Sequence, residues 1–406
     1  MEIRQSLVVP VTDACDVLVC GGGFAGVSAA LAAARLGKKV ILLEKQYMLG
    51  GLGTAGLITI FLPLCDGLGH QISFGLAEEL LRLSVSVTAE SKPEGLRGYG
   101  NWVVGNDPAK RTKADPRFEV GYNAQLCAIL MEQALQKAGV ELRYGTYAVG
   151  VHQEGDRIAA VLTESKSGRR AIAVRSVVDA TGDADLAFAA GVPCEPFSKG
   201  NALAAWYYEA TDKGYGLKMM GFSDVPDEKR ETSANVALGG RRYDGLDEKD
   251  ITAFVETAHA SVLNDIRKRR AAGEEVVPAT IPTIPQLRMT RRIVGRTVLD
   301  DKSDHAFVTD SVGMVSDWRK RGPVFEVPFS SLYAASCPNL ITAGRCTSVT
   351  EAMWDVMRVI PCCCVTGQAA GTAAAMTDDF AALDVASLQK QLQADKVVLH
   401  VRDLGL

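Results

Sequence analysis

The chain has 406 residues, of which 47% are hydrophobic and 23% are charged, and its net charge at pH 7 is −4. This length exceeds what one simple core usually holds, so we expect two sequential or intertwined domains. The slightly acidic balance offers no general attraction for nucleic acid, and we expect no nucleic-acid partner.

No apolar run reaches the length of a membrane span, and the first residues lack the basic and then apolar pattern of a secretory signal. We therefore expect a cytoplasmic chain without a membrane partner. The 10 cysteines do not make a disulfide framework in a chain of this length, so we expect free thiols.

The first clear pattern along the chain is a βαβ unit, VLVCGGGFAGVSAALAAARLGKKVILLEK. Residues 16–20 are apolar and β-branched, as in a buried strand, and residues 40–43 form a second such run. Small residues dominate residues 25–36, which favours a helix lying close on a sheet.

The glycines after the first strand fit the pattern G-x-G-x-x-G at Gly21, Gly23 and Gly26. Such glycines permit a tight turn, let the backbone approach a pyrophosphate and let the helix pack closely. The helix N-terminus then offers N–H groups and partial positive charge to the phosphates. Glu44, at the end of the second strand, can accept hydrogen bonds from a ribose. The unit predicts a nucleotide site, the alternative being a glycine-rich turn in an ordinary α/β domain.

A second glycine-rich loop, residues 50–61, follows the acid, and a helix is expected at residues 75–84. Residues 92–117 are polar and rich in Gly, Pro and Asn, which favours an excursion or lid. Residues 123–138 have helical periodicity and end at Gly139, a suitable C-cap.

A meander of short strands comes next, with turns at Gly155-Asp156 and at Gly168. The expected strands are residues 140–144, 147–152, 157–163 and 171–174. The following stretch, SVVDATGDADLAFAAGV, has the pattern of a buried strand, a glycine turn and a helix.

Residues 197–300 differ in character, with mixed polarity, aromatic residues such as Trp206 and Tyr207, and a charged helix around residues 247–272. We expect a substrate-side domain there. The chain then returns to the character of the nucleotide fold, with the run NLITAGR and a small-residue helix at residues 362–376. This helix begins with three consecutive cysteines. Their side chains point about 100° apart, so we expect small-residue packing and no metal site.

Taken in order, these motifs resemble the FAD-dependent oxidoreductase family, near the flavoproteins of the fumarate reductase and glutathione reductase structural groups. The stretches that carry the resemblance are the βαβ unit, GGLGTAG, VVDATGDADLAFAAGV, TRRIVG, NLITAGR and RVIPCCCVTGQAAGTAAA. The resemblance implies FAD rather than NAD in the first fold. No histidine is placed to attach the flavin, so we expect non-covalent FAD.

The resemblance implies an α/β fold: a Rossmann-like FAD-binding domain of three-layer ββα architecture with an inserted α+β substrate domain. The expected parts are the FAD-binding segments 1–84, 118–196 and 326–385, the excursion or lid 85–117, the substrate-side segment 197–325 and a C-terminal tail 386–406.

Each motif also has a cofactor role under this resemblance. The first glycines would hold the pyrophosphate, Glu44 the adenosine ribose, and the second glycine loop would lie beside the flavin. The closing helix would point its N-terminus at the pyrimidine edge of the flavin. The implied cofactor-binding residues are Gly21, Gly23, Phe24, Ala25, Gly26, Glu44, Lys45, Gly50, Gly51, Thr54, Ala180, Thr181, Gly182, Asp183, Gly344, Arg345, Arg358 and Val359.

Candidate catalytic residues come from three places. Arg288, Arg291 and Arg292 cluster in QLRMTRRIVG and could clamp a carboxylate or polarise a carbonyl. The family motif favours Arg291 and Arg292, and the alternative is a strand whose arginines form salt bridges. His70 follows the flavin-side loop and could line the site.

Glu351 occupies a position where relatives often have a histidine. A glutamate transfers protons near neutral pH only if burial raises its pKa, so this departure points to different substrate chemistry. We expect Glu351 or Asp355 as an acid–base group. The alternative is a buried acid paired with Arg358 or Arg345.

The expected function is hydride transfer between flavin N5 and a small organic substrate, because no second dinucleotide unit for NAD(P)H appears. The electron acceptor or donor is unknown, and a homo-oligomer is left open. The alternatives are a flavin-dependent monooxygenase and a non-catalytic FAD-binding electron-transfer protein.

Overall fold

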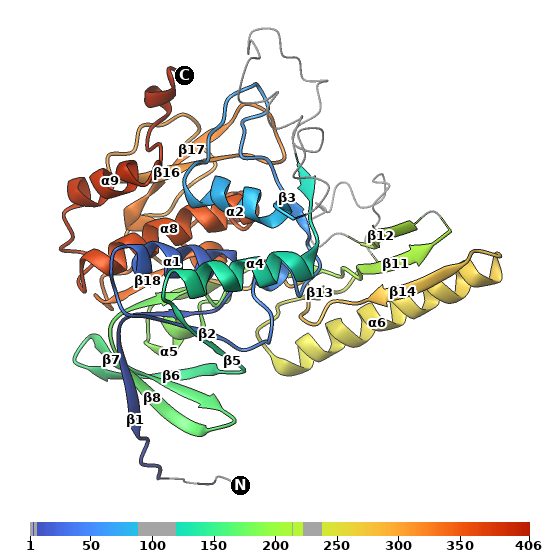
Figure 1. Ribbon diagram of the computed structural model, residues 1–406, viewed down its shortest axis with the longest axis horizontal. Helices are drawn as coiled ribbons and strands as arrows, with labels where there is room; N and C mark the ends of the chain where they lie inside the picture. Colours follow the sequence, from blue (N-terminus) through green and yellow to red (C-terminus); the bar gives the residue numbers. More distant parts are fainter. Residues whose placement is uncertain (1–2, 4–5, 88–118, 213, 222–237) are drawn as a thin grey trace.

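The computed structural model describes residues 3, 6–87, 119–212, 214–221 and 238–406 (Figure 1). The predicted lid, 85–117, lies outside the described residues except for 85–87.

A seven-stranded sheet forms the centre of the fold, in the order β5-β2-β1-β8-β7-β6, with β18 also pairing with β8. Strands β5, β2, β1, β8 and β18 pair in parallel, whereas β6, β7 and β8 pair antiparallel. The strands are β1 (Val11–Cys20), β2 (Val40–Glu44), β5 (Glu141–Tyr144), β6 (Tyr147–Glu154), β7 (Arg157–Ser165), β8 (Gly168–Asp179) and β18 (Leu340–Thr342).

Strand β8 takes part in both kinds of pairing. Its first half pairs with β7 in the antiparallel meander, and its last residues pair with β18 in the parallel sheet. The sequence predicted two separate runs here, residues 171–174 and the apolar start of residues 176–192. The structure corrects this to one strand of 12 residues.

The parallel sheet lies between two layers. Side chains alternate along β1, so Val17 and Val19 join a cluster with the helices, whereas Leu18 and Cys20 join a cluster with the meander residues Ile158 and Val161. The fold is therefore the predicted three-layer α/β arrangement of helices, parallel sheet and antiparallel strands.

The helices of the central body are mostly those that the sequence predicted. Four of them form close to the bounds expected from the sequence, at residues 25–36, 75–84, 123–138 and 362–376. The helices are α1 (Phe24–Arg35), α2 (Leu76–Val85), α4 (Ala124–Lys137), α5 (Asp185–Ala189), α7 (Glu351–Met357), α8 (Ile360–Met376) and α9 (Val385–Ala394).

Helices α1 and α8 run side by side through the centre of the body (Figure 1). A Cβ added to Gly367 of α8 would overlap the carbonyl oxygen of Ala25, and one added to Gly371 would overlap that of Ala29. The contacts advance in the same direction along both helices, so the two N-termini lie at the same end.

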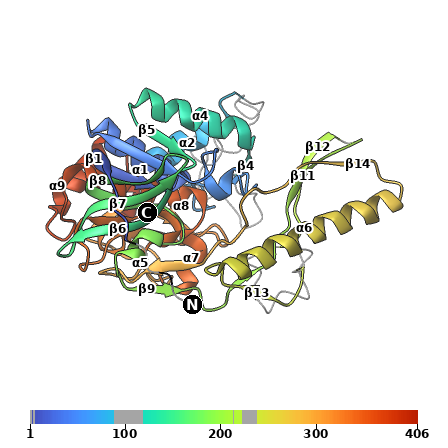
Figure 2. The ribbon, with the colours of Figure 1, turned by 90° about the horizontal axis from the view of Figure 1, so that it is seen from below.

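An arm projects from this body in both views (Figures 1 and 2). It consists of the sheet β12-β11-β14 and the long helix α6, which Asp247 caps through two backbone N–H groups. Tyr207, Val262 and Ile266 pack between the helix and the sheet. The elements are β11 (Tyr207–Thr211), β12 (Gly214–Lys218), α6 (Glu248–Ala271) and β14 (Val276–Thr280).

Short antiparallel strand pairs lie outside these two larger sheets. They are β3 (Ile60–Phe61) with β4 (Val120–Gly121), β9 (Cys194–Pro196) with β15 (Arg291–Ile293), and β10 (Asn201–Ala202) with β13 (Arg242–Tyr243).

The predicted substrate-side segment, 197–325, lies in two places. Its first part forms the arm, but the hairpin of β16 (Ser311–Ser316) and β17 (Val324–Pro328) packs on the main core through Val315 and Phe325. The tail covers this hairpin, because His400 contacts Glu326 at 2.8 Å.

Among the described residues, no single helix is both long and apolar enough to cross a membrane. Helices α7 and α8 reach that length and apolar composition only when taken together, and the chain bends by 90° between them.

The wall between arm and body depends on one buried side chain, Asn201. Its Oδ1 accepts hydrogen bonds from the backbone N–H groups of Arg288 (2.9 Å) and Met289 (3.1 Å), and its Nδ2 donates to the carbonyls of Tyr243 and Met289. Asn339 makes a comparable set of bonds elsewhere, to the backbone of Ile158 and the carbonyl of Arg175.

We expect Gly371→Ala to lower the free energy of unfolding by about 1 to 3 kcal/mol, because the new Cβ overlaps the backbone of α1. Gly216→Ala is the control, since no atom lies within 4 Å of its Cβ position. Urea unfolding followed by circular dichroism measures both. Equal midpoints for the two variants would show that the helices do not touch in this way.

We expect Asn201→Ala and Asn339→Ala each to cost about 2 to 4 kcal/mol of stability, since each leaves several buried backbone groups unpaired. Only Asn201→Ala should speed hydrogen exchange at the amides of Arg288 and Met289, whereas Asn339→Ala should speed it at Ile158. Exchange read by mass spectrometry separates them, and unchanged protection at Arg288 in Asn201→Ala contradicts the assignment.

Candidate functional site

One cavity of about 710 Å³ brings the predicted motifs together. It opens at the carboxyl ends of β1, β2, β8 and β18, where the strands meet the N-termini of α1 and α8. In parallel α/β sheets this edge is where ligands bind.

The three motif glycines of the turn before α1 differ in what surrounds them. Gly21 has φ +104°, and a Cβ there would overlap the carbonyl of Ala180. A Cβ at Gly26 would overlap the carbonyl of Gly21, so this glycine lets the helix leave the strand. Gly23 has an ordinary φ of −67°, and nothing lies within 4 Å of its Cβ position. Gly23 therefore faces open space in the cavity.

Glu44 lines the same cavity, although the residue is only 6% exposed. Its Oε2 accepts a hydrogen bond from the N–H of Gly22 (2.7 Å), and its Oε1 accepts one from the N–H of Gln46 (2.7 Å). The carboxylate therefore fixes the glycine turn, and each oxygen keeps lone-pair capacity for a ligand.

A buried carboxylate organises the second signature, residues 180–183. Asp179 accepts hydrogen bonds from Thr181 Oγ1 (2.7 Å) and from the N–H groups of Leu186 and Ala187. Burial raises the pKa of Asp179, and these bonds oppose the rise. Burial, with Asp183 and Asp179 nearby, also raises the pKa of Asp185 to about 6.

Arg345 links this signature to the wall of the arm. Its Nη1 donates to the carbonyls of Leu287 (2.8 Å) and Arg288 (3.0 Å), and its Nη2 lies 3.5 Å from Asp183. Gly182, at φ +85°, makes room, because a Cβ there would overlap the Arg345 guanidinium.

The N-terminus of α8 supplies the other end of the cavity, with Arg358, Val359 and Cys363. Asp355 holds Arg358 by accepting from its Nε at 2.8 Å. Burial raises the pKa of Cys363 to about 11, although Arg345 and Arg358 oppose the rise. This thiol is therefore protonated at neutral pH.

Most of the predicted cofactor residues line this cavity. The two that do not, Gly26 and Thr54, shape its loops; the Thr54 hydroxyl donates to the carbonyl of Leu49. The lining members are Gly21, Gly23, Phe24, Ala25, Glu44, Lys45, Gly50, Gly51, Ala180, Thr181, Gly182, Asp183, Gly344, Arg345, Arg358 and Val359.

The favoured arginines, Arg291 and Arg292, do not line the cavity. Arg291 donates to Asp185 (2.8 Å) and lies over Phe188. Arg292 pairs with Glu195 (2.8 Å), and its guanidinium carbon lies 5.0 Å from the Trp354 ring centre. Both follow the alternative interpretation, in which the arginines of this strand form salt bridges.

The other catalytic candidates also lie off the cavity lining. Glu351 accepts from the N–H and Oγ of Ser198, each at 2.7 Å, and pairs with neither Arg358 nor Arg345 in those bonds. His70 contacts Asp66 at 2.7 Å. Asp355 does not line the cavity but accepts a hydrogen bond from Arg358, which does, and this matches the alternative of an acid paired with that arginine.

The arm end of the cavity contains residues that the sequence analysis did not single out. Trp318, Glu119 and residues 283–285 line it, next to Trp206 and Arg288. The one sequence feature that could have pointed to residues 283–285 is the run TIPTIPQLR, which has two prolines before Arg288.

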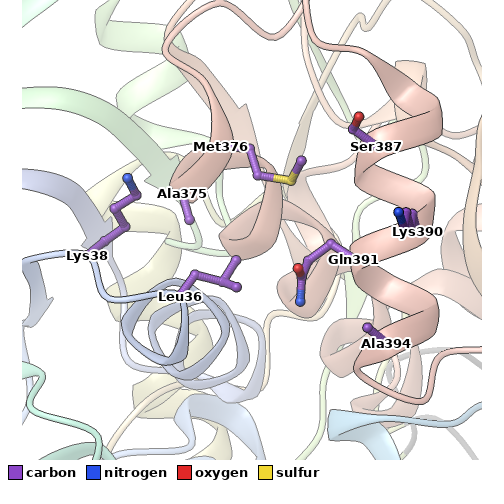
Figure 3. Close-up of a pocket in the computed structure, with 8 residues that line it drawn as sticks. All are labelled: Leu36, Lys38, Ala375, Met376, Ser387, Lys390, Gln391 and Ala394. Atoms are coloured by element: carbon purple, nitrogen blue, oxygen red, sulfur yellow. The ribbon is translucent and has the colours of Figure 1, made fainter.

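A second hollow of about 370 Å³ lies between the C-terminal ends of α1 and α8 and one side of α9 (Figure 3). Leu36, Met376 and Gln391 face it, and none of the predicted site residues lines it. Among the described residues, no group of three His, Cys, Asp or Glu side chains could hold a metal ion.

Comparison with curated proteins and solved structures gave distant relatives. A thioredoxin reductase of Ureaplasma parvum serovar 3 is 32% identical over 79 residues, which is 20% of this chain and 26% of that protein. The match thus spans about a quarter of the relative.

Several solved structures are similar at low identity. A geranylgeranyl bacteriochlorophyll reductase-like protein from Thermoplasma acidophilum is 14% identical, with a TM-score of 0.42, over 95% of this chain and 82% of that one. A flavocytochrome c3 fumarate reductase is 13% identical, with a TM-score of 0.42, over 90% and 79%. A 3-ketosteroid-Δ4-(5α)-dehydrogenase from Rhodococcus jostii RHA1 is 14% identical, with a TM-score of 0.42, over 91% and 98%.

The profile of one family, described as FAD dependent oxidoreductase, matches residues 16–202 and 196–392. These two ranges include nearly all of the parts that line the cavity. The chain belongs to the FAD-dependent oxidoreductase family, and it is therefore an enzyme whose cofactor is FAD.

Proposed function

We propose that this enzyme transfers a hydride between flavin N5 and a small organic substrate bound at the arm end of the cavity. The observation that carries the proposal is the continuity of one cavity, from Glu44 in the nucleotide fold to Trp206 and Arg288 beside the arm. A cofactor and a substrate in one space can react directly.

The residues present fit FAD. Gly23 leaves open the space that a Cβ would fill, at the N-terminus of α1, where a pyrophosphate binds best. Glu44 stands at the end of β2, where its carboxylate oxygens could accept hydrogen bonds from the hydroxyl groups of an adenosine ribose. The adenosine half of FAD thus belongs at this end of the cavity.

The residues that would hold the flavin half are those at the N-terminus of α8, with Arg358 and Cys363 beside it. FAD would supply at N5 an acceptor or donor of one hydride, which carries two electrons. A substrate that loses a hydride there also loses one proton. Arg358 and the α8 N-terminus place positive charge at this end, where a reduced flavin would be negative. Asp355 acts as a positioning residue by holding Arg358.

Glu351, Arg291, Arg292 and His70 remain catalytic candidates only through other side chains, because none of them lines the cavity. None of the five histidines lies in the cavity wall either. We therefore propose that cations, rather than an imidazole, activate the substrate.

The visible spectrum of the purified enzyme tests the cofactor geometry first. Flavin bands that move to the supernatant after acid precipitation are expected for non-covalent FAD. Anaerobic bleaching of those bands by a substrate, without oxygen uptake, is expected for hydride transfer. Oxygen uptake with a hydroxylated product would favour a monooxygenase, and a flavin that no organic compound reduces would favour an electron-transfer protein.

We expect Gly23→Ala to raise the dissociation constant of FAD about tenfold or more, about 1.4 kcal/mol, because its methyl group enters the pyrophosphate space. Its stability without FAD should match wild type, since φ is −67° and no atom is displaced.

The matched variant Gly26→Ala should differ from Gly23→Ala in stability without FAD. We expect its free energy of unfolding to fall by about 1 to 3 kcal/mol, because its methyl group would overlap the carbonyl of Gly21. Flavin fluorescence titration and urea unfolding give the two quantities. A Gly23→Ala enzyme that binds FAD like wild type would place the pyrophosphate elsewhere.

A further inference from the structure

A chain of four alternating charges lies behind the α8 end of the cavity. Its members, in order of contact, are Asp317, Arg319, Asp355 and Arg358. Of these four, only Arg358 lines the cavity, and its side chain is 6% exposed. The other three come from two different segments, the turn between β16 and β17 and the helix α7.

Each link of this chain is a direct contact. Asp355 Oδ1 accepts a hydrogen bond from Arg358 Nε at 2.8 Å, and Asp355 Oδ2 accepts one from Arg319 Nη1 at 3.2 Å. The Nε and Nη2 of Arg319 each donate to one oxygen of Asp317 at 3.0 Å. Asp355 is therefore shared between two guanidinium groups, and Arg319 is shared between two carboxylates.

The turn that carries Asp317 and Arg319 is itself held in place. Asp317 is only 2% exposed, and it also accepts from the backbone N–H of Arg319 at 2.8 Å. The Nε1 of Trp318 donates to the carbonyl of Asp355 at 2.9 Å. The guanidinium carbon of Arg358 lies 5.7 Å from the centre of the Trp318 ring. The position of Asp355 thus depends on the turn as well as on its own helix.

The order of the charges matters for the cavity. Two carboxylates and two guanidinium groups sum to zero, but the positive member Arg358 is the one at the cavity wall. Its effect there depends on how strongly Asp355 neutralises it. Arg319 competes for the same carboxylate, and Asp317 in turn limits that competition. Charges buried in this way interact more strongly than charges in water.

A flavin bound at this end would respond to such charges. Its reduction at neutral pH adds two electrons and one proton, so the reduced form has one negative charge more than the oxidised form. A nearby cation therefore raises the reduction potential of the flavin, and a nearby carboxylate lowers it.

We propose that Asp317 and Arg319 are positioning residues that act through Asp355 on Arg358, so that the β16–β17 turn sets the reduction potential of the bound flavin. This inference deepens the proposed function and rests on its placement of the flavin at the α8 end. Among residues 311–328, only Trp318 lines the cavity. The turn would thus act on the flavin mainly through α7.

Two variants with opposite charge changes test the proposal. The two-electron potential is measured on the intact FAD-bound enzyme, during reduction by dithionite with a reference dye and without substrate. Asp355→Asn removes a counter-charge of Arg358, so we expect the potential to rise by about 30 mV or more, which is tenfold in the ratio of reduced to oxidised flavin. Arg319→Gln leaves Asp355 to Arg358 alone, so we expect the potential to fall.

Further variants separate this role from a loss of packing. Arg319→Lys keeps the charge and should stay closer to wild type than Arg319→Gln. Arg319→Gln should shift the potential less in the Asp355→Asn background than in wild type, because the residue through which it acts is gone. Arg169→Gln, which removes an exposed charge paired with Glu164 on the meander, should leave the potential unchanged.

Arg319→Gln decides the outcome by itself when Asp355→Asn does not retain FAD, since the Arg319 side chain is 29% exposed and tolerates replacement better. A potential in Arg319→Gln that equals or exceeds that of wild type overturns the proposal. A wild-type enzyme whose flavin no organic compound reduces would instead sink the proposed function. These potentials could still be measured in that case, so the two failures are distinguishable.

Discussion

The close packing of α1 on α8 is the constraint on which the rest of the structure depends. Gly367 and Gly371 leave no room for side chains between the helices, so their backbones approach and their N-termini reach the same cavity. One helix end follows the first strand and the other follows the last, so the beginning and end of the fold converge there. Two positive helix ends in one cavity suit a cofactor that carries negative charge along its length.

The two helix ends that meet at the cavity are also the parts that the sequence predicted best. The βαβ unit and the small-residue closing helix depend on local patterns: strand runs, glycine spacing and helical periodicity. The glycines even separate by role once backbone geometry is known, since Gly26 serves the turn and Gly23 faces the cavity. Local patterns of this kind predicted the βαβ unit and its glycine turn, whereas the three-layer fold and most of the predicted cofactor residues followed from the family resemblance that the motifs carry together.

The sequence was weaker wherever a side chain depends on partners from distant segments. Three arginines in QLRMTRRIVG look equivalent in the sequence, but Arg291 and Arg292 meet Asp185 and Glu195, whereas Arg288 enters the cavity wall. Glu195 could not be assigned to Arg292 before the strand β15 was paired with β9, and Asp185 comes from a separate helix, α5. Glu351 is a similar case, because its partner Ser198 is far away in the chain.

Arg345 connects the two ends of the site, and this has a consequence for how the enzyme would work. The same guanidinium lies against Gly182 of the cofactor signature and binds the carbonyl of Arg288. A shift of the signature on FAD binding would therefore reach the backbone of Arg288 in the cavity wall. A rigid element with contacts at both sites can couple them without a large movement. Because binding free energies are reciprocal, a substrate bound beside this wall would then change the affinity for FAD by the same factor by which FAD changes the affinity for the substrate.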